Sequence, residues 1–169
     1  MKRRLLFSFL ATTVMIVAMR VQGGALLRPP QSRRGIVDLE FAWTEPRYAE
    51  LMALWRRPVV LGNLYLDFLF IAAYAWFLWT ASRTLGTRFR MPRVPSVFAG
   101  LGVAAGALDL VENACLLYRV HGGSGSWALT TAGIAAGAKF SAVLAVLLFL
   151  LYALLGKRKR RRAGAPSSV

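Results

Sequence analysis

Long apolar stretches with very few charged residues mark the candidate membrane spans of this chain. Three such stretches lie between residues 58 and 156, and each contains only one or two acidic or basic side chains. A bilayer core about 30 Å thick requires about 20 apolar residues in a helix, and each stretch supplies that number. The pattern therefore predicts membrane-spanning helices over residues 58–81, 96–118 and 129–155.

The N-terminal apolar run, residues 5–19, is short for a membrane span and long for the apolar part of a signal peptide. If the helix continues, with Arg20 reaching toward the surface or facing protein, residues 5–27 form a first span. Cleavage near residues 23–25 is the alternative, although no clean Ala-x-Ala site is present. We expect the uncleaved helix, which gives an all-α fold: a transmembrane four-helix bundle in a single domain, residues 1–156.

Residues 28–57 form the predicted external segment between the first two spans. Apolar and acidic residues alternate over residues 36–43, which places Asp38 and Glu40 on the side opposite the apolar residues. This pattern predicts that both carboxylates face away from the apolar side of the segment.

A short amphipathic helix is predicted to follow in the same segment. Thr44 can serve as its N-cap, and Pro46 is tolerated in its first turn. One apolar stripe along this helix would consist of Tyr48, Leu51, Met52 and Trp55. We expect the helix to lie at the outer membrane surface or to pack over the mouth of the bundle, with Trp43 and Trp55 at headgroup level. A lid that gates a substrate is the alternative.

Composition agrees with a membrane protein. Of the 169 residues, 57% are apolar and 17% are charged, whereas ordinary soluble domains have about 45–50% and about 25%. The mean hydropathy is +0.50. The single cysteine, Cys115, can form no intramolecular disulfide. These values exclude a disordered chain, a collagen-like repeat and a disulfide-stapled secreted miniprotein.

The distribution of the basic residues predicts the orientation. The net charge is +15, and three basic clusters, at residues 2–4, 83–93 and 157–162, fall on one side of a four-span bundle. Because lysine and arginine concentrate in short cytoplasmic flanks, we expect both termini in the cytoplasm of a bacterial cell and the protein in its inner membrane. The basic tail, residues 157–169, is expected to bind anionic lipid, at about 1 kcal/mol per basic residue. We expect no nucleic-acid binding, since no aromatic interleaving or nucleic-acid motif accompanies these charges.

Charged residues also occur inside the predicted spans. Three of the seven acidic residues, Asp67, Asp109 and Glu112, lie there, together with Lys139. A charge at the bilayer centre costs about 2.5 to more than 10 kcal/mol, so such residues face the bundle interior and pair with one another. From the rise of about 1.5 Å per residue, all four lie about 9–18 Å from the external ends of their helices. We therefore predict one polar layer, made of Asn63, Asp67, Asp109, Glu112, Asn113 and Lys139.

The charges of this layer do not balance. Either one or two carboxyl groups are protonated at neutral pH, or Arg20, Arg119 or a bound cation supplies the missing positive charge. The layer is either a buried network that sets the helix register or a site for a ligand, a cation or a proton.

Small residues predict which spans meet. Residues 102–106 and 133–137 both begin and end with glycine, a small-xxx-small pattern that allows close backbone approach. We expect the third and fourth spans to touch through these residues, and a homo-oligomer through the same motifs is the alternative.

Catalytic signatures are few. The only histidine, His121, lies in a short loop, so the sequence offers no catalytic triad and no histidine cluster for a metal or haem, and we expect no cofactor. We expect a binding or assembly protein built around the polar layer rather than an enzyme. One alternative is an intramembrane enzyme in which Asp67, Asp109 or Glu112 transfers protons on a lipid or other apolar substrate. Another is a small proton- or cation-coupled transporter.

Four segments together resemble a functionally uncharacterised family of small bacterial four-helix integral membrane proteins. They are residues 35–42, 64–70, 108–114 and 138–140. The resemblance covers most of the chain and implies a bacterial inner-membrane setting. It implies no activity and no catalytic residues.

Overall fold

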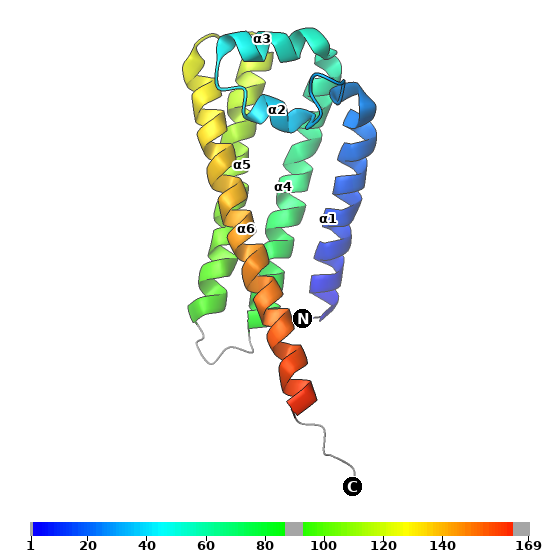
Figure 1. Ribbon diagram of the computed structural model, residues 1–169, viewed down its shortest axis with the longest axis vertical. Helices are drawn as coiled ribbons and strands as arrows, with labels where there is room; N and C mark the ends of the chain where they lie inside the picture. The colour runs from blue at the N-terminus through cyan, green and yellow to red at the C-terminus, as the bar shows by residue number, and fades with distance from the viewer. Residues whose placement is uncertain (1, 87–92, 164–169) are drawn as a thin grey trace.

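The computed structural model describes residues 2–86 and 93–163, which contain seven helical elements and no strand. Four are long helices, α1 (Lys2–Gly23), α4 (Arg57–Gly86), α5 (Arg93–Val120) and α6 (Ser126–Ala163). Three short ones, η1 (Gly24–Leu27), α2 (Ile36–Glu40) and α3 (Glu45–Leu54), lie across one end of the bundle (Figure 1). We call residues 24–56, which contain these short helices, the cap.

The four predicted spans are confirmed as helices long and apolar enough to cross a membrane. These spans cover Arg3–Gly23, Arg57–Gly86, Arg93–Val120 and Ser126–Leu155. The first is shorter than the predicted 5–27, because the chain turns into the 3-10 helix η1 at Gly24, whose φ is +35°. The last helix continues into the basic tail as far as Ala163, and residues 164–169 of the predicted tail lie outside the described residues.

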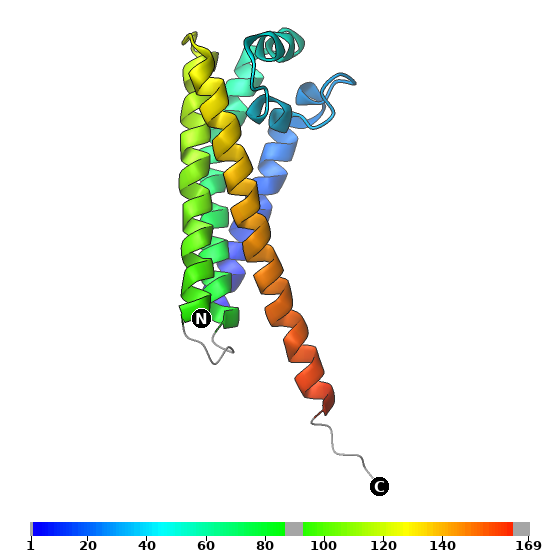
Figure 2. The same cartoon turned by 60° about the vertical axis from the view of Figure 1, so that its left-hand side comes forward.

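The long helices are not packed equally. α5 packs along both α4 and α6, whereas α1 packs mainly along α4. Figure 2 shows that α6 is inclined to α4 and α5, so that its C-terminal end leaves the bundle. As a result, α1 borders α6 across a groove over part of its length.

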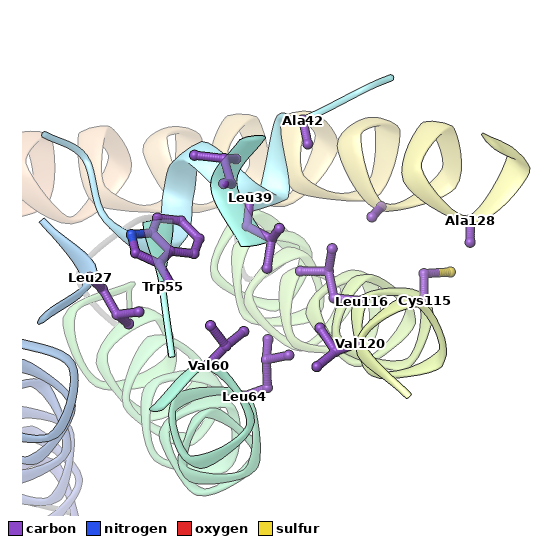
Figure 3. Packing of buried hydrophobic residues seen from close by; sticks show 12 residues of the cluster. Leu27, Leu39, Ala42, Trp55, Val60, Leu64, Cys115, Leu116, Val120 and Ala128 are labelled. Carbon is purple, nitrogen blue, oxygen red and sulfur yellow. The ribbon is translucent and has the colours of Figure 1, made fainter. Parts of the chain in front are cut away.

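Two apolar clusters form the core, one under the cap and one in the opposite half of the bundle. In the first, Leu27, Leu39 and Trp55 from the cap gather with Val60 of α4 and Leu116 of α5 (Figure 3). The second contains Ile71, Leu78, Ala105, Val146 and Phe149, among others. On α5, Asp109, Glu112 and Asn113 fall between the two clusters, and Lys139 does so on α6.

The predicted short helix of the cap is confirmed as α3. The Thr44 side chain accepts a hydrogen bond from the Arg47 backbone N–H, with a donor–acceptor distance of 3.5 Å, and Pro46 lies in the first turn. Trp55, however, is only 4% exposed, so the placement of this ring at headgroup level is wrong. Its indole packs in the cluster under the cap because the chain turns there from α3 into α4.

The predicted alternation over residues 36–43 is also wrong. Residues 36–40 form the helix α2, in which Leu39 and Glu40 are both buried rather than on opposite sides. Trp43 follows with a positive φ of 54°, which points its ring at Gly133 of α6. The acidic side chain of Glu40 therefore enters the bundle, which the alternation excluded.

The predicted contact between the third and fourth spans exists, but the glycines do not make it as expected. α5 and α6 do pack together. Yet a Cβ on Gly102 would lie 2.8 Å from Leu78 Cβ, and one on Gly106 would lie 3.1 Å from Ala75 Cβ, so both glycines face α4. On α6, a Cβ on Gly137 would meet nothing within 4 Å. Only the first glycine pair therefore works as a close-packing motif within the bundle.

The Gly102→Ala variant tests this packing. The added methyl group collides with Leu78 Cβ, which is too close to the backbone to move away, so overpacking should cost about 1–3 kcal/mol. We expect a clearly lower midpoint of thermal unfolding in detergent, and no change for the matched control Gly137→Ala. Equal midpoints for the two variants would contradict the assignment of Gly102 to the interface between α4 and α5.

Candidate functional site

A buried lysine forms the centre of the polar region. The Lys139 Nζ lies 2.7 Å from Glu112 Oε2, 2.8 Å from Asp109 Oδ1 and 3.6 Å from Glu40 Oε2. Its ammonium also stands 4.8 Å from the centroid of the Phe140 ring. Lys139, Asp109 and Glu112 are 6%, 3% and 1% exposed, so these charges are sheltered from solvent. We call Lys139 and its three carboxylates the lysine cluster.

Helical geometry brings the members of the lysine cluster together. Asp109 and Glu112 are three residues apart on α5 and so share one face, which packs against the face of α6 that carries Lys139. Tyr74 on α4 donates a hydrogen bond to the second oxygen of Asp109, at 2.8 Å. Glu40 enters from α2 in the cap. Four elements that are far apart in the sequence therefore meet at this one cluster.

The remaining residues of the predicted layer do not join the lysine cluster. Asn113 Nδ2 donates to Asp67 Oδ2 at 2.6 Å, which links α5 to α4. Asn63 Nδ2 donates to Gln22 Oε1 at 2.9 Å, and Gln22 Nε2 donates to the Val59 carbonyl at 2.9 Å, which links α4 to α1. The six predicted residues are thus distributed over three separate hydrogen-bonded groups rather than one.

Sequence reasoning missed three members of these groups. Glu40 was assigned to the outer side of the external segment, and no role was assigned to Tyr74 within the polar layer or to Gln22. Glu40 lies among apolar residues, where a buried acid would require a partner, but Asp38 has the same surroundings and the sequence does not distinguish the two. The amide of Gln22, close to the end of the first span, was a signal of a polar contact.

The charge excess of the lysine cluster remains after folding, since three carboxylates surround one ammonium. Arg119 does not supply the missing charge, because its guanidinium pairs with Glu45 in the cap, donates to the Gly123 carbonyl and stacks over Tyr48 at 4.9 Å. Burial raises the pKa of Glu40 above its ordinary value, an effect that the charge of Lys139 opposes and that of Asp109 reinforces. Glu40 therefore takes up a proton more readily than an ordinary glutamate does, and its charge responds to pH.

Two hollows lie beside α1, away from the lysine cluster. The first, about 470 Å³, lies between α1, α4 and the cap, and we call it the cap crevice. It is lined by Ile16, Met19, Arg20, Gly23, Gly24, Leu27, Arg28, Gly35, Ile36, Asn63 and Phe70. The second, about 560 Å³, lies between α1, α4 and the C-terminal half of α6, and its walls are entirely apolar.

The chemistry that this arrangement supports is limited. The lysine cluster is closed and its groups hold one another, which suits a structural role. Within residues 2–86 and 93–163, no group of three or more histidine, cysteine or acidic side chains is arranged to hold a metal ion. The cap crevice, by contrast, opens at the surface of the bundle, since Ile16 in its wall is 53% exposed.

No family model, curated protein or solved structure matches this chain. The resemblance to a family of small bacterial membrane proteins therefore stays a prediction, and the geometry carries the functional argument.

Removal of the central charge tests the structural role of the lysine cluster. The Lys139→Met variant leaves three carboxylates without a counter-charge, so the free energy of unfolding in detergent should fall by about 3–5 kcal/mol. The control is Arg47→Ala, which removes the exposed ion pair with Glu50 and should cost less than about 1 kcal/mol. The structural role is refuted if Lys139→Met unfolds at the same denaturant concentration as the wild type.

The raised pKa of Glu40 predicts a pH dependence. The folded protein holds this proton more tightly than the unfolded chain, so the stabilising effect of Glu40 is complete below its ordinary pKa of 4.5 and is lost as the pH rises through the folded pKa. The thermal midpoint of the wild type should therefore decline with rising pH relative to that of Glu40→Gln. Parallel pH profiles for the two proteins would show that Glu40 is not the group that carries the proton.

Proposed function

We propose that this chain is a multi-pass protein of the bacterial inner membrane that binds a lipid-like amphiphile in the cap crevice. The observation that carries the proposal is the cavity of about 470 Å³, which opens between α1, α4 and the cap at one end of the spanning helices. Its walls are apolar apart from Arg20, Arg28 and Asn63. Binding sites for small amphiphilic molecules combine such apolar walls with a few polar groups that fix orientation.

The residues that line the crevice favour a binding function over a catalytic one. They include no carboxylate, histidine, cysteine or hydroxyl side chain, which are the usual proton-transfer groups and nucleophiles. Asp109 and Glu112, the candidate acids of an intramembrane enzyme, are engaged by Lys139 instead. A ligand in the crevice would therefore meet groups that hold it rather than groups that transform it.

The lysine cluster has an assembly role in this proposal. Glu40 reaches Lys139 from α2, and Glu45 reaches Arg119 from the start of α3. These two ion pairs attach the cap to α6 and α5. Because Gly35 and Ile36 of the cap form one wall of the crevice, the ion pairs hold that wall in place.

Orientation follows from the basic residues. The tail end of the bundle carries the clusters at residues 2–4 and 157–162, which the positive-inside rule assigns to the cytoplasm. The cap and its crevice then lie at the outer face of the membrane, and the basic tail binds anionic lipid of the inner leaflet. The ligand of the crevice would accordingly be drawn from the outer leaflet.

Native mass spectrometry of the protein purified in mild detergent tests the proposal. We expect the wild type to retain bound lipid and Met19→Trp, which fills the crevice from its wall, to lose it. Val17→Trp is the matched control, because residue 17 lies on the exposed side of α1 and lines neither hollow. Equal amounts of bound lipid in all three proteins would overturn the proposal.

A further inference from the structure

The cap crevice contains two arginines from different elements. Arg20 lies in the last turn of α1, and Arg28 follows the 3-10 helix η1. Both side chains line the crevice, and both residues are exposed. Among the side chains that the structure describes, none forms a hydrogen bond or an ion pair with either guanidinium.

No acidic side chain described in the structure forms an ion pair with either arginine. All seven acidic residues are engaged elsewhere in the described part of the chain. Glu40, Asp109 and Glu112 contact Lys139. Glu45 pairs with Arg119, and Glu50 pairs with Arg47. Asp38 accepts a hydrogen bond from Ser32, and Asp67 accepts one from Asn113. The crevice therefore has two positive charges and no acidic residue among those that line it.

We propose that the ligand of the cap crevice is an anionic phospholipid whose phosphate is held between Arg20 and Arg28. This inference rests on the proposed lipid-binding function and specifies the ligand class. A guanidinium presents a planar fork of N–H donors that matches phosphate oxygens, and such charge-assisted bonds are stronger than neutral ones. A headgroup that also carries an ammonium is disfavoured, since its positive charge would lie beside two arginines with no carboxylate nearby.

The rest of the crevice suits the apolar part of such a lipid. Below the arginines the wall consists of Ile16, Met19 and Phe70. Arg20 lies in the last turn of α1, at the end of a candidate span, where a lipid headgroup would be within reach. Farther down α1, Leu5 and Phe9 line the second, wholly apolar hollow. An acyl chain that leaves the crevice along α1 and α4 therefore has an apolar path on the same side of the bundle.

Two double variants with the same change in net charge distinguish specific binding of the lipid phosphate in the crevice from general attraction of anionic lipid to a basic protein. Arg20→Gln/Arg28→Gln removes both crevice cations, and Arg33→Gln/Arg34→Gln removes two exposed arginines of the cap that do not line the crevice. Each protein is titrated with phosphatidylglycerol or phosphatidylethanolamine of identical acyl chains, and bound lipid is counted by native mass spectrometry. Thermal unfolding in detergent verifies that the variants fold.

We expect the wild type and Arg33→Gln/Arg34→Gln to prefer phosphatidylglycerol, and Arg20→Gln/Arg28→Gln to bind it about tenfold more weakly. Equal binding of the two lipids by the wild type, or equal losses in the two double variants, would overturn the assignment of the headgroup. The lipid-binding function would survive that outcome if Met19→Trp still lost lipid. Unchanged lipid binding in Met19→Trp would overturn both proposals.

Discussion

The buried ammonium of Lys139 is the constraint on which the rest of the structure depends. Inside a bilayer a charge without a partner is very costly, so this side chain must keep its carboxylates within reach. Two of them come from α5 and one comes from α2 in the cap. The same requirement that joins α5 to α6 therefore also holds a short connecting segment against the end of the bundle, where it becomes a wall of the cap crevice.

The crevice lies beside α1 because α1 is attached to the bundle by fewer specific contacts than α4 and α5 are to each other. Apolar surface contributes little to helix association in lipid, so close packing and hydrogen bonds must do so. α4 and α5 have both, through Gly102 and through the pair of Asp67 and Asn113. For α1, the described side-chain hydrogen bonds to another helix all involve Gln22, near the end of α1. Both hollows consequently lie beside α1 rather than between the tightly joined helices.

The candidate site could be predicted only in part. The rise per residue gives the depth of Asp109, Glu112 and Lys139, and the i, i+3 spacing places the two acids on one face. These are local properties, and the structure agrees with them. Which helix a face meets depends on the rotation of each helix against its neighbours. For that reason the sequence could not separate Asn63 and Asp67 from the lysine cluster.

The sequence by itself determined the four spanning helices and the Thr44-capped helix, because hydropathy, span length and capping act within one segment. Only the tertiary structure decided that Glu40 and Trp55 turn inward and that Arg20 and Arg28 line one hollow. The physical reason is that these placements arise from contacts between elements distant along the chain. A pattern read along one segment, such as the alternation over residues 36–43, contains no information about a partner like Lys139, about a hundred residues away.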